Sequence, residues 1–125
     1  MKLRIKGNSI RLRLSQSEVD QIGRGEAVNE QVSFGNNSSG FSYSLQPQAE
    51  QTEIFAQYAD NKLLIMLPEK KAQLWASSDI VGMENDISFE NGDTLYILIE
   101  KDFQCLHQRP REDEQDNFPN PAAQT

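Results

Sequence analysis

Basic side chains are concentrated at the start of the sequence, and their spacing is its clearest chemical signal. The set is Lys2, Arg4, Lys6, Arg11 and Arg13. Residues 2–6 and 9–14 alternate charged and apolar side chains around Gly7-Asn8, which predicts a hairpin with all five cations on one face. Arginine binds carboxylates and phosphates through a planar, two-pronged guanidinium. We therefore expect this face to bind an anionic small molecule or an acidic protein segment.

Like charges placed opposite one another in a hairpin disfavour strand pairing, so something must neutralise this face. Ordinary solvation with ion pairs to Glu30, Glu100 and Asp102 is one explanation. A second is the acidic segment Glu112-Asp113-Glu114 with Asp116, folded back across the hairpin. A third is an external anion. The sequence leaves all three open.

Other residues with chemical potential do not form a recognisable site. Cys105 and His107 are the only cysteine and histidine, whereas a zinc site needs three or four ligands. The loop 36–40 lacks the Lys-Ser/Thr pair of a phosphate-binding loop, and Trp75 fits a core position. The carboxylates Glu84, Asp86, Glu90 and Asp93 fall around expected turns. We therefore expect no metal and no cofactor, and we favour a non-enzymatic protein.

Length and charge narrow the class of protein. A chain of 125 residues with 37% apolar residues fits one domain, which we assign to residues 1–106, followed by an acidic Pro/Asn/Gln-rich arm at 107–125. The net charge of −7 argues against a general nucleic-acid binder. No apolar run approaches the ~20 residues of a membrane span, and no signal peptide is evident. With no possible internal disulfide, we expect a cytoplasmic protein.

The elements that position these residues come from an internal duplication. A shift of 53 residues, for example from Asn8 to Asn61, superposes the apolar rhythm of residues 1–46 on residues 54–100, with two residues inserted before Ile87. Each unit is predicted to contain two strands, one helix and two further strands. The first helix has a capping box at Ser15 and Glu18, and the second begins near Pro68.

The predicted fold class is α+β. About eight strands should form a curved or barrel-like antiparallel sheet that holds two short helices. The two units differ at the positions of the five cations, where the second hairpin has no charge. Its residues there are Phe55, Gln57, Ala59, Leu64 and Met66. We expect that hairpin to be buried on both faces or covered by a partner, and a homo-oligomer formed through Phe55, Leu64 and Met66 is one possibility.

Three segments carry a resemblance to a known family. They are residues 2–19, the stretch Leu98-Ile99-Glu100-Lys101-Asp102-Phe103, and Phe118-Pro119-Asn120-Pro121. On these segments the chain resembles, over its full length, a family of short uncharacterised bacterial proteins. That family has no assigned activity and implies no site residues.

The predicted order of elements is also similar to the CYTH, or triphosphate-tunnel, fold. That fold duplicates a strand, a helix and three strands, which is the order here when the first unit begins at Ser9. Its first strand carries alternating glutamates and a lysine, where this chain has Lys2, Arg4 and Lys6. The resemblance implies an alternative function, a divergent phosphohydrolase with the arginines on phosphate and Glu100 or Asp102 near a metal.

Overall fold

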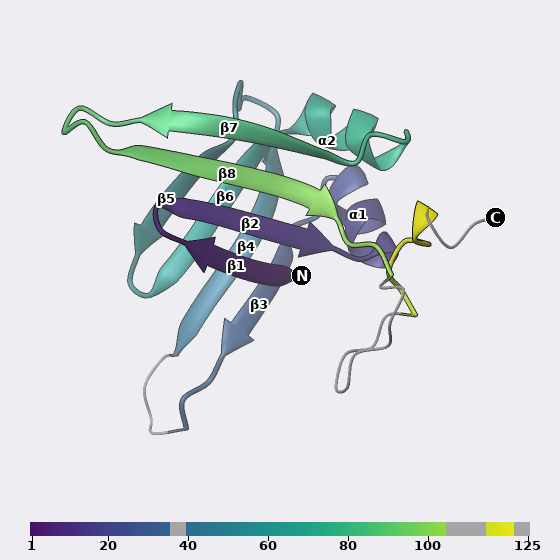
Figure 1. Ribbon diagram of the computed structural model, residues 1–125, viewed down its shortest axis with the longest axis horizontal. Coiled ribbons are helices and arrows are strands. Elements are labelled where there is room, and N and C mark those ends of the chain that lie inside the picture. The colour runs from purple at the N-terminus through teal and green to yellow at the C-terminus, as the bar shows by residue number, and fades with distance from the viewer. Residues whose placement is uncertain (36–39, 105–114, 122–125) are drawn as a thin grey trace.

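The computed structural model describes residues 1–35, 40–104 and 115–121, and within them each unit contains two strands, a helix and two strands (Figure 1). The first unit consists of β1 (Lys2–Lys6), β2 (Ser9–Leu14), α1 (Gln16–Gly23), β3 (Val28–Val32) and β4 (Phe41–Gln48). The second consists of β5 (Phe55–Ala59), β6 (Lys62–Pro68), α2 (Glu69–Ala76), β7 (Gly82–Ser88) and β8 (Thr94–Lys101). The α+β class, the eight strands and the two helices are confirmed.

The strands form two four-stranded sheets, and each sheet combines strands of both units. The first sheet has the order β1-β2-β8-β7 and the second the order β3-β4-β6-β5. Within each unit the strands pair antiparallel, but β2 pairs with β8 and β4 pairs with β6 in parallel. The described strands therefore do not close into a barrel, and both sheets are mixed, which differs from the single antiparallel sheet expected. Alternating apolar residues define which face is buried but not which strand is the neighbour.

The duplication relates the two sheets to each other. Moving each strand of the first unit onto its counterpart in the second converts the order β1-β2-β8-β7 into β5-β6-β4-β3, which is the other sheet. The two central strand pairs also have the same register. Arg13 lies opposite Glu100 in the first sheet, and their counterparts, Met66 and Gln46, lie opposite each other in the second. The chain therefore has a pseudo-twofold arrangement in which neither unit contains a complete sheet.

The core lies between the two sheets and is closed at one end by the helices (Figure 1). Strand β2 leads directly into α1 and β6 into α2, which places both helices at the same end. The largest fully buried side chains come from both units: Leu12, Leu14, Ile22, Leu45, Ile65, Leu67, Trp75, Ile97 and Ile99. The helices are only eight residues long, so their stability depends on packing against the sheets and each other.

The segment 115–121 docks beside the end of β8. The backbone N–H of Phe118 donates to the carbonyl of Asp102 at 2.8 Å, and the N–H of Gln104 donates to the carbonyl of Phe118 at 2.6 Å. Lys101 lies over the Phe118 ring, 5.4 Å from its centroid. Burial lowers the pKa of Lys101, whose ammonium donates to the Ser78 carbonyl. Phe118 thus anchors part of the predicted arm to the domain.

Within the part of the chain that the structure describes, no helix is long and apolar enough to cross a membrane.

The helix pair makes a close contact between equivalent positions of the two units. A Cβ built on Gly23, the last residue of α1, would lie 2.5 Å from the Cβ of Ala76, the last residue of α2. We predict that Gly23→Ala destabilises the fold by about 1–3 kcal/mol, because overpacking forces the two helices apart. Urea denaturation followed by circular dichroism would measure this change.

A double variant separates the effect of this contact on stability from the effect of the residue types on helix propensity. Gly23→Ala combined with Ala76→Gly removes the clash and should recover part of the lost stability, although glycine in a helix itself costs about 1 kcal/mol. A Gly23→Ala protein as stable as the wild type would contradict the predicted close packing.

Candidate functional site

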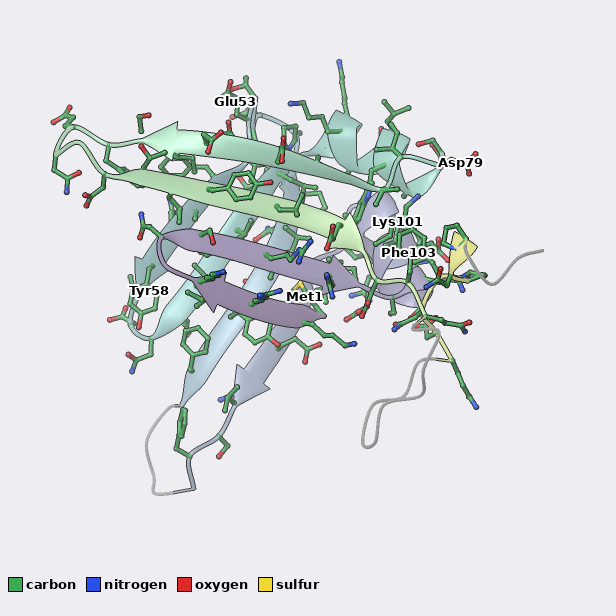
Figure 2. All side chains as sticks on the ribbon, in the orientation of Figure 1. Met1, Glu53, Tyr58, Asp79, Lys101 and Phe103 are labelled. Atoms are coloured by element: carbon green, nitrogen blue, oxygen red, sulfur yellow. The ribbon has the colours of Figure 1, made fainter. Side chains whose placement is uncertain are left out.

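The five cations of the first hairpin alternate with residues of the core and so lie on the outer face of the first sheet. Figure 2 labels Met1, which directly precedes this hairpin. The register places Lys2 opposite Arg13 and Arg4 opposite Arg11, so the like-charge pairs expected from the sequence are formed. Their apolar neighbours point inward, because side chains alternate along a strand. The cations therefore face solvent rather than a tunnel.

Carboxylates neutralise one end of this basic face. Arg13 Nε donates to Glu100 Oε1 at 2.8 Å, and Lys2 Nζ lies 3.0 Å from Asp102 Oδ2. Arg11 Nε also lies 2.8 Å from Glu100 Oε1, but its geometry does not make a hydrogen bond. Ion pairing with neighbouring strands, the first explanation above, therefore accounts for these three cations. Glu30 does not take part, since it lies 3.0 Å from the α-amino group of Met1.

The other end of the basic face lacks such partners. None of the described carboxylates lies within ion-pair distance of Arg4 or Lys6. These side chains border a hollow of about 310 Å³. Its lining is Arg4, Lys6, Ser9, Ile10, Arg11, Tyr96 and Leu98. We name this the basic hollow; it has the charge and the free donors to bind one anionic group.

The far side of the same sheet face is acidic. Glu84 and Asp86 on β7 lie opposite Leu98 and Tyr96 on β8, in register with the basic hollow. The Tyr96 hydroxyl donates to Glu84, and this hydrogen bond raises the pKa of Tyr96. The charge on this face therefore changes from positive at β1 and β2 to negative at β7.

The acidic segment expected to fold back over the hairpin is only partly described. Glu112-Asp113-Glu114 lies outside the described residues. Asp116 lies at the start of α1, where its carboxylate accepts hydrogen bonds from the Ser17 hydroxyl and, at 3.2 Å, from the Ser17 backbone N–H. Asp116 therefore caps a helix, and it also lines a hollow together with Lys2 and Arg13 at one end of the basic face.

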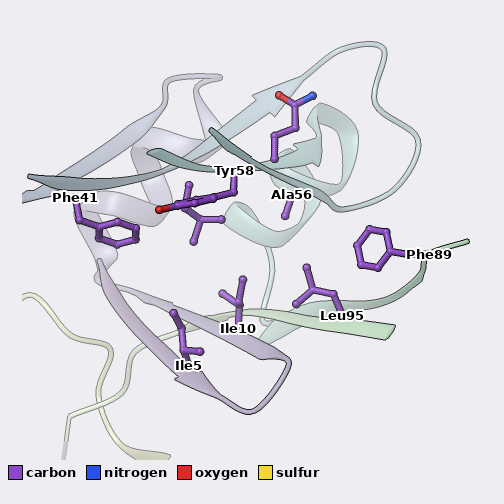
Figure 3. A pocket seen from close by; sticks show the side chains of 9 residues that line it. Ile5, Ile10, Phe41, Ala56, Tyr58, Phe89 and Leu95 are labelled. Carbon is purple, nitrogen blue, oxygen red and sulfur yellow. The ribbon is translucent and has the colours of Figure 1, made fainter. Parts of the chain in front are cut away.

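An apolar groove that the sequence analysis did not identify opens between the two sheets, at the end away from the helices (Figure 3). Its volume is about 540 Å³. The lining is Ile5, Ile10, Phe41, Ala56, Gln57, Tyr58, Leu63, Phe89 and Leu95. We name it the inter-sheet groove. Six of these residues form three equivalent pairs of the duplication, namely Ile5 with Tyr58, Ile10 with Leu63, and Phe41 with Leu95.

Sequence reasoning missed this groove because alternation assigns all inward residues to one core. Ile5 and Tyr58 do point inward, yet they are 60% and 63% exposed, since the helices close only the opposite end. Both residues lie near the tips of their hairpins, far along the strands from the helix junctions. That distance is the signal that could have revealed the open end.

The uncharged face of the second hairpin lies on the outside of the second sheet. Phe55 lies directly opposite Met66, and Leu64 is opposite Gln57. Met66 is buried and Leu64 half-buried, but Phe55 is 38% exposed and Gln57 is also exposed. The expectation of burial on both faces therefore holds for much of β6 and is wrong for the edge strand β5.

The candidate metal ligands and the thiol named from the sequence are placed only in part. Among the described residues, no group of three or more His, Cys, Asp or Glu side chains could hold a metal ion. Asp102 and Glu100 are each held by basic side chains of the first hairpin. Cys105 and His107 lie outside the described residues.

Comparison of the sequence with protein-family models found a match. One model matches residues 1–122, which include both units and the docked segment. The chain belongs to the family of unknown function DUF7009. The resemblance to an uncharacterised family over nearly the whole chain is thereby confirmed, and DUF7009 assigns no activity to any residue. The comparison with curated proteins found no match, and the comparison with solved structures found none either.

The docked segment of this DUF7009 chain generates a pH prediction. Hydrogen bonds from Ser17 and Ser15 hold the pKa of Asp116 below its usual 3.8. Its contribution to stability is therefore full above pH 3.8 and is lost as the pH falls through the lowered pKa. We expect Asp116→Ala to be less stable than the wild type at pH 6, and the difference in urea midpoint to shrink below pH 3.8.

The control is Asp20→Ala, which removes an exposed carboxylate from the same helix without touching the docked segment. It should leave the pH dependence as in the wild type. A stability difference for Asp116→Ala that stays constant from pH 6 to pH 3 would contradict the role assigned to Asp116.

Proposed function

We propose that this protein is a non-enzymatic binding module whose basic hollow holds an anionic group of a small molecule or of an acidic protein segment. The observation that carries the proposal is the division of the five cations. Lys2 and Arg13 are engaged by carboxylates, whereas Arg4 and Lys6 have no described carboxylate partner and border a hollow. Exposed cations are often only solvated, but two cations without a described carboxylate partner at the edge of a hollow favour a bound oxyanion.

The structure supports the alternative function, a divergent phosphohydrolase of the CYTH type, less well than it supports anion binding. Such an enzyme needs a tunnel that surrounds the triphosphate, whereas the described strands form two open sheets. The carboxylates suggested as metal ligands, Glu100 and Asp102, are each paired with basic side chains of the first hairpin, and Asp102 is buried. We therefore place the hydrolase second. We keep a cytoplasmic location as part of the proposal.

Thermal-shift measurement with sulfate and sodium triphosphate, with and without magnesium, tests the proposed anion site. A ligand that binds only the folded state raises the melting temperature. We expect triphosphate to stabilise the protein without magnesium, and Arg4→Gln or Lys6→Gln to weaken binding about tenfold, equivalent to about 1.4 kcal/mol. Sodium chloride at matched ionic strength controls for general screening.

The matched control variant is Arg24→Gln, which removes an exposed arginine paired with Glu26 at the end of α1. Its affinity for triphosphate should equal that of the wild type. If triphosphate and sulfate give no stabilisation, or if Arg24→Gln weakens binding as much as Arg4→Gln, the anion site is disproved.

Glu100→Gln distinguishes the two proposals by the sign of its effect. As a binding module, the protein should bind triphosphate several-fold more tightly, because Arg11 and Arg13 lose the carboxylate that neutralises them. As a metal-dependent hydrolase, it should lose release of phosphate. Calorimetry with triphosphate and a phosphate-release assay with magnesium would be run on the same preparations.

A homo-oligomer through Phe55, Leu64 and Met66 stays a prediction. Of the three, only Phe55 is substantially exposed, so the area offered is small. Light scattering that gives a mass above 14.2 kDa would support it, and a clean monomer would exclude it.

A further inference from the structure

We propose that the inter-sheet groove binds the alkyl chain of an amphipathic anion, such as a long-chain carboxylate. The position of the anionic headgroup rests on the proposed function, whereas the groove itself is argued independently. Three observations carry the inference: the size and lining of the groove, the exposure of its aromatic and aliphatic walls, and the position of the basic hollow at the same hairpin.

The size and lining fit a small apolar ligand. Ligand pockets in proteins usually measure about 300–1,000 Å³ and are lined mainly by apolar side chains. The inter-sheet groove has about 540 Å³, and among the described residues that line it only Gln57 lacks an apolar or aromatic side chain. The floor contains Ile10 and Leu63, which are 9% and 7% exposed and belong to the core. The groove is therefore a recess whose floor consists of packed core side chains.

The exposure of the walls is costly without an occupant. Besides Ile5 and Tyr58, Phe89 is 39% exposed. Burying a large apolar side chain yields about 1.5–3 kcal/mol, and contiguous exposed apolar surface on a monomer usually marks a binding site. Figure 3 shows these side chains on opposite walls, directed toward a common space. A flexible chain placed between the walls would contact both sheets at once.

The nearness of the basic hollow, on the other face of the same hairpin, selects an anionic headgroup. Ile10 lines both the inter-sheet groove and the basic hollow. Ile5, on the wall of the groove, stands between Arg4 and Lys6 in the edge strand β1, which have no described carboxylate partner. An alkyl chain in the groove can therefore extend around this edge and place its carboxylate near those two cations. Charge and apolar surface meet at one hairpin, as an amphipathic anion requires.

Calorimetry with three probes tests the proposal: dodecanoate below its critical micelle concentration, dodecanol, and acetate. We expect dodecanoate to bind at one molecule per chain and acetate to show no measurable binding. Ile5→Ser and Tyr58→Ser remove opposite walls at exposed positions, so the fold should survive, and each should weaken dodecanoate binding at least tenfold. Circular dichroism checks that both variants are folded.

The matched control is Leu74→Ser, since Leu74 is 57% exposed on α2 and does not line the groove. It should bind dodecanoate like the wild type. The groove is rejected as a ligand site if neither dodecanoate nor dodecanol binds, or if Ile5→Ser and Tyr58→Ser leave binding unchanged. It is also rejected if light scattering shows a dimer that Ile5→Ser and Tyr58→Ser convert to a monomer, because a second copy then covers the groove.

The headgroup is tested separately. Arg4→Gln and Lys6→Gln should weaken binding of dodecanoate but not of dodecanol. If dodecanol binds in a manner that depends on Ile5 and Tyr58 while triphosphate fails to bind, the groove is supported and the proposed anion site is disproved. If triphosphate binds but neither dodecanoate nor dodecanol binds, the proposed anion site is supported and the groove is disproved as a ligand site.

Discussion

The parallel pairing of strands from different units is the interaction on which the rest of the structure depends. Strands β2 and β8 form the centre of one sheet, and β4 and β6 form the centre of the other. Because both central pairs join the two units, each unit supplies one hairpin to each sheet. A single unit would leave its inner strands without half of their hydrogen-bond partners, and would expose the apolar face that the other sheet covers. The two units must therefore fold around a shared core.

This exchange also explains why the two ends of the molecule differ. Strands β2 and β6 both lead into helices at one end, so α1 and α2 meet there, and Gly23 contacts its counterpart Ala76. The other end receives only hairpin tips. The inward side chains near those tips, Ile5 and Tyr58, have no helix to cover them. A closed helical end and an open apolar end are thus two results of one chain order, and the groove needs no special insertion to form.

Local structure was largely predictable, because it depends on neighbours in sequence. The Gly7-Asn8 and Asp60-Asn61 turns, which have positive φ at Gly7, Asp60 and Asn61, pair the hairpins in the register expected from the sequence. The partition into two sheets was not predictable, because alternation specifies buried faces and not neighbours. The ion pairs of Glu100 depend on the β2 and β8 pairing and so were only one of several possibilities. The groove escaped notice since inward orientation does not guarantee burial.

Equivalent positions on the outer faces of the two sheets differ in charge, and the pattern of the differences indicates what each charge does. Arg13 lies opposite Glu100 in the first sheet, and the equivalent pair in the second sheet is Met66 and Gln46. Both partners of the ion pair are therefore replaced by uncharged residues at once, as expected if the pair is a structural unit. Arg4 and Lys6 have counterparts Gln57 and Ala59, also uncharged, but no described carboxylate accompanies them in the first sheet. Structural ion pairing explains Arg13 and Glu100 without a ligand, whereas it leaves Arg4 and Lys6 unexplained, and the proposed anion site rests on those two.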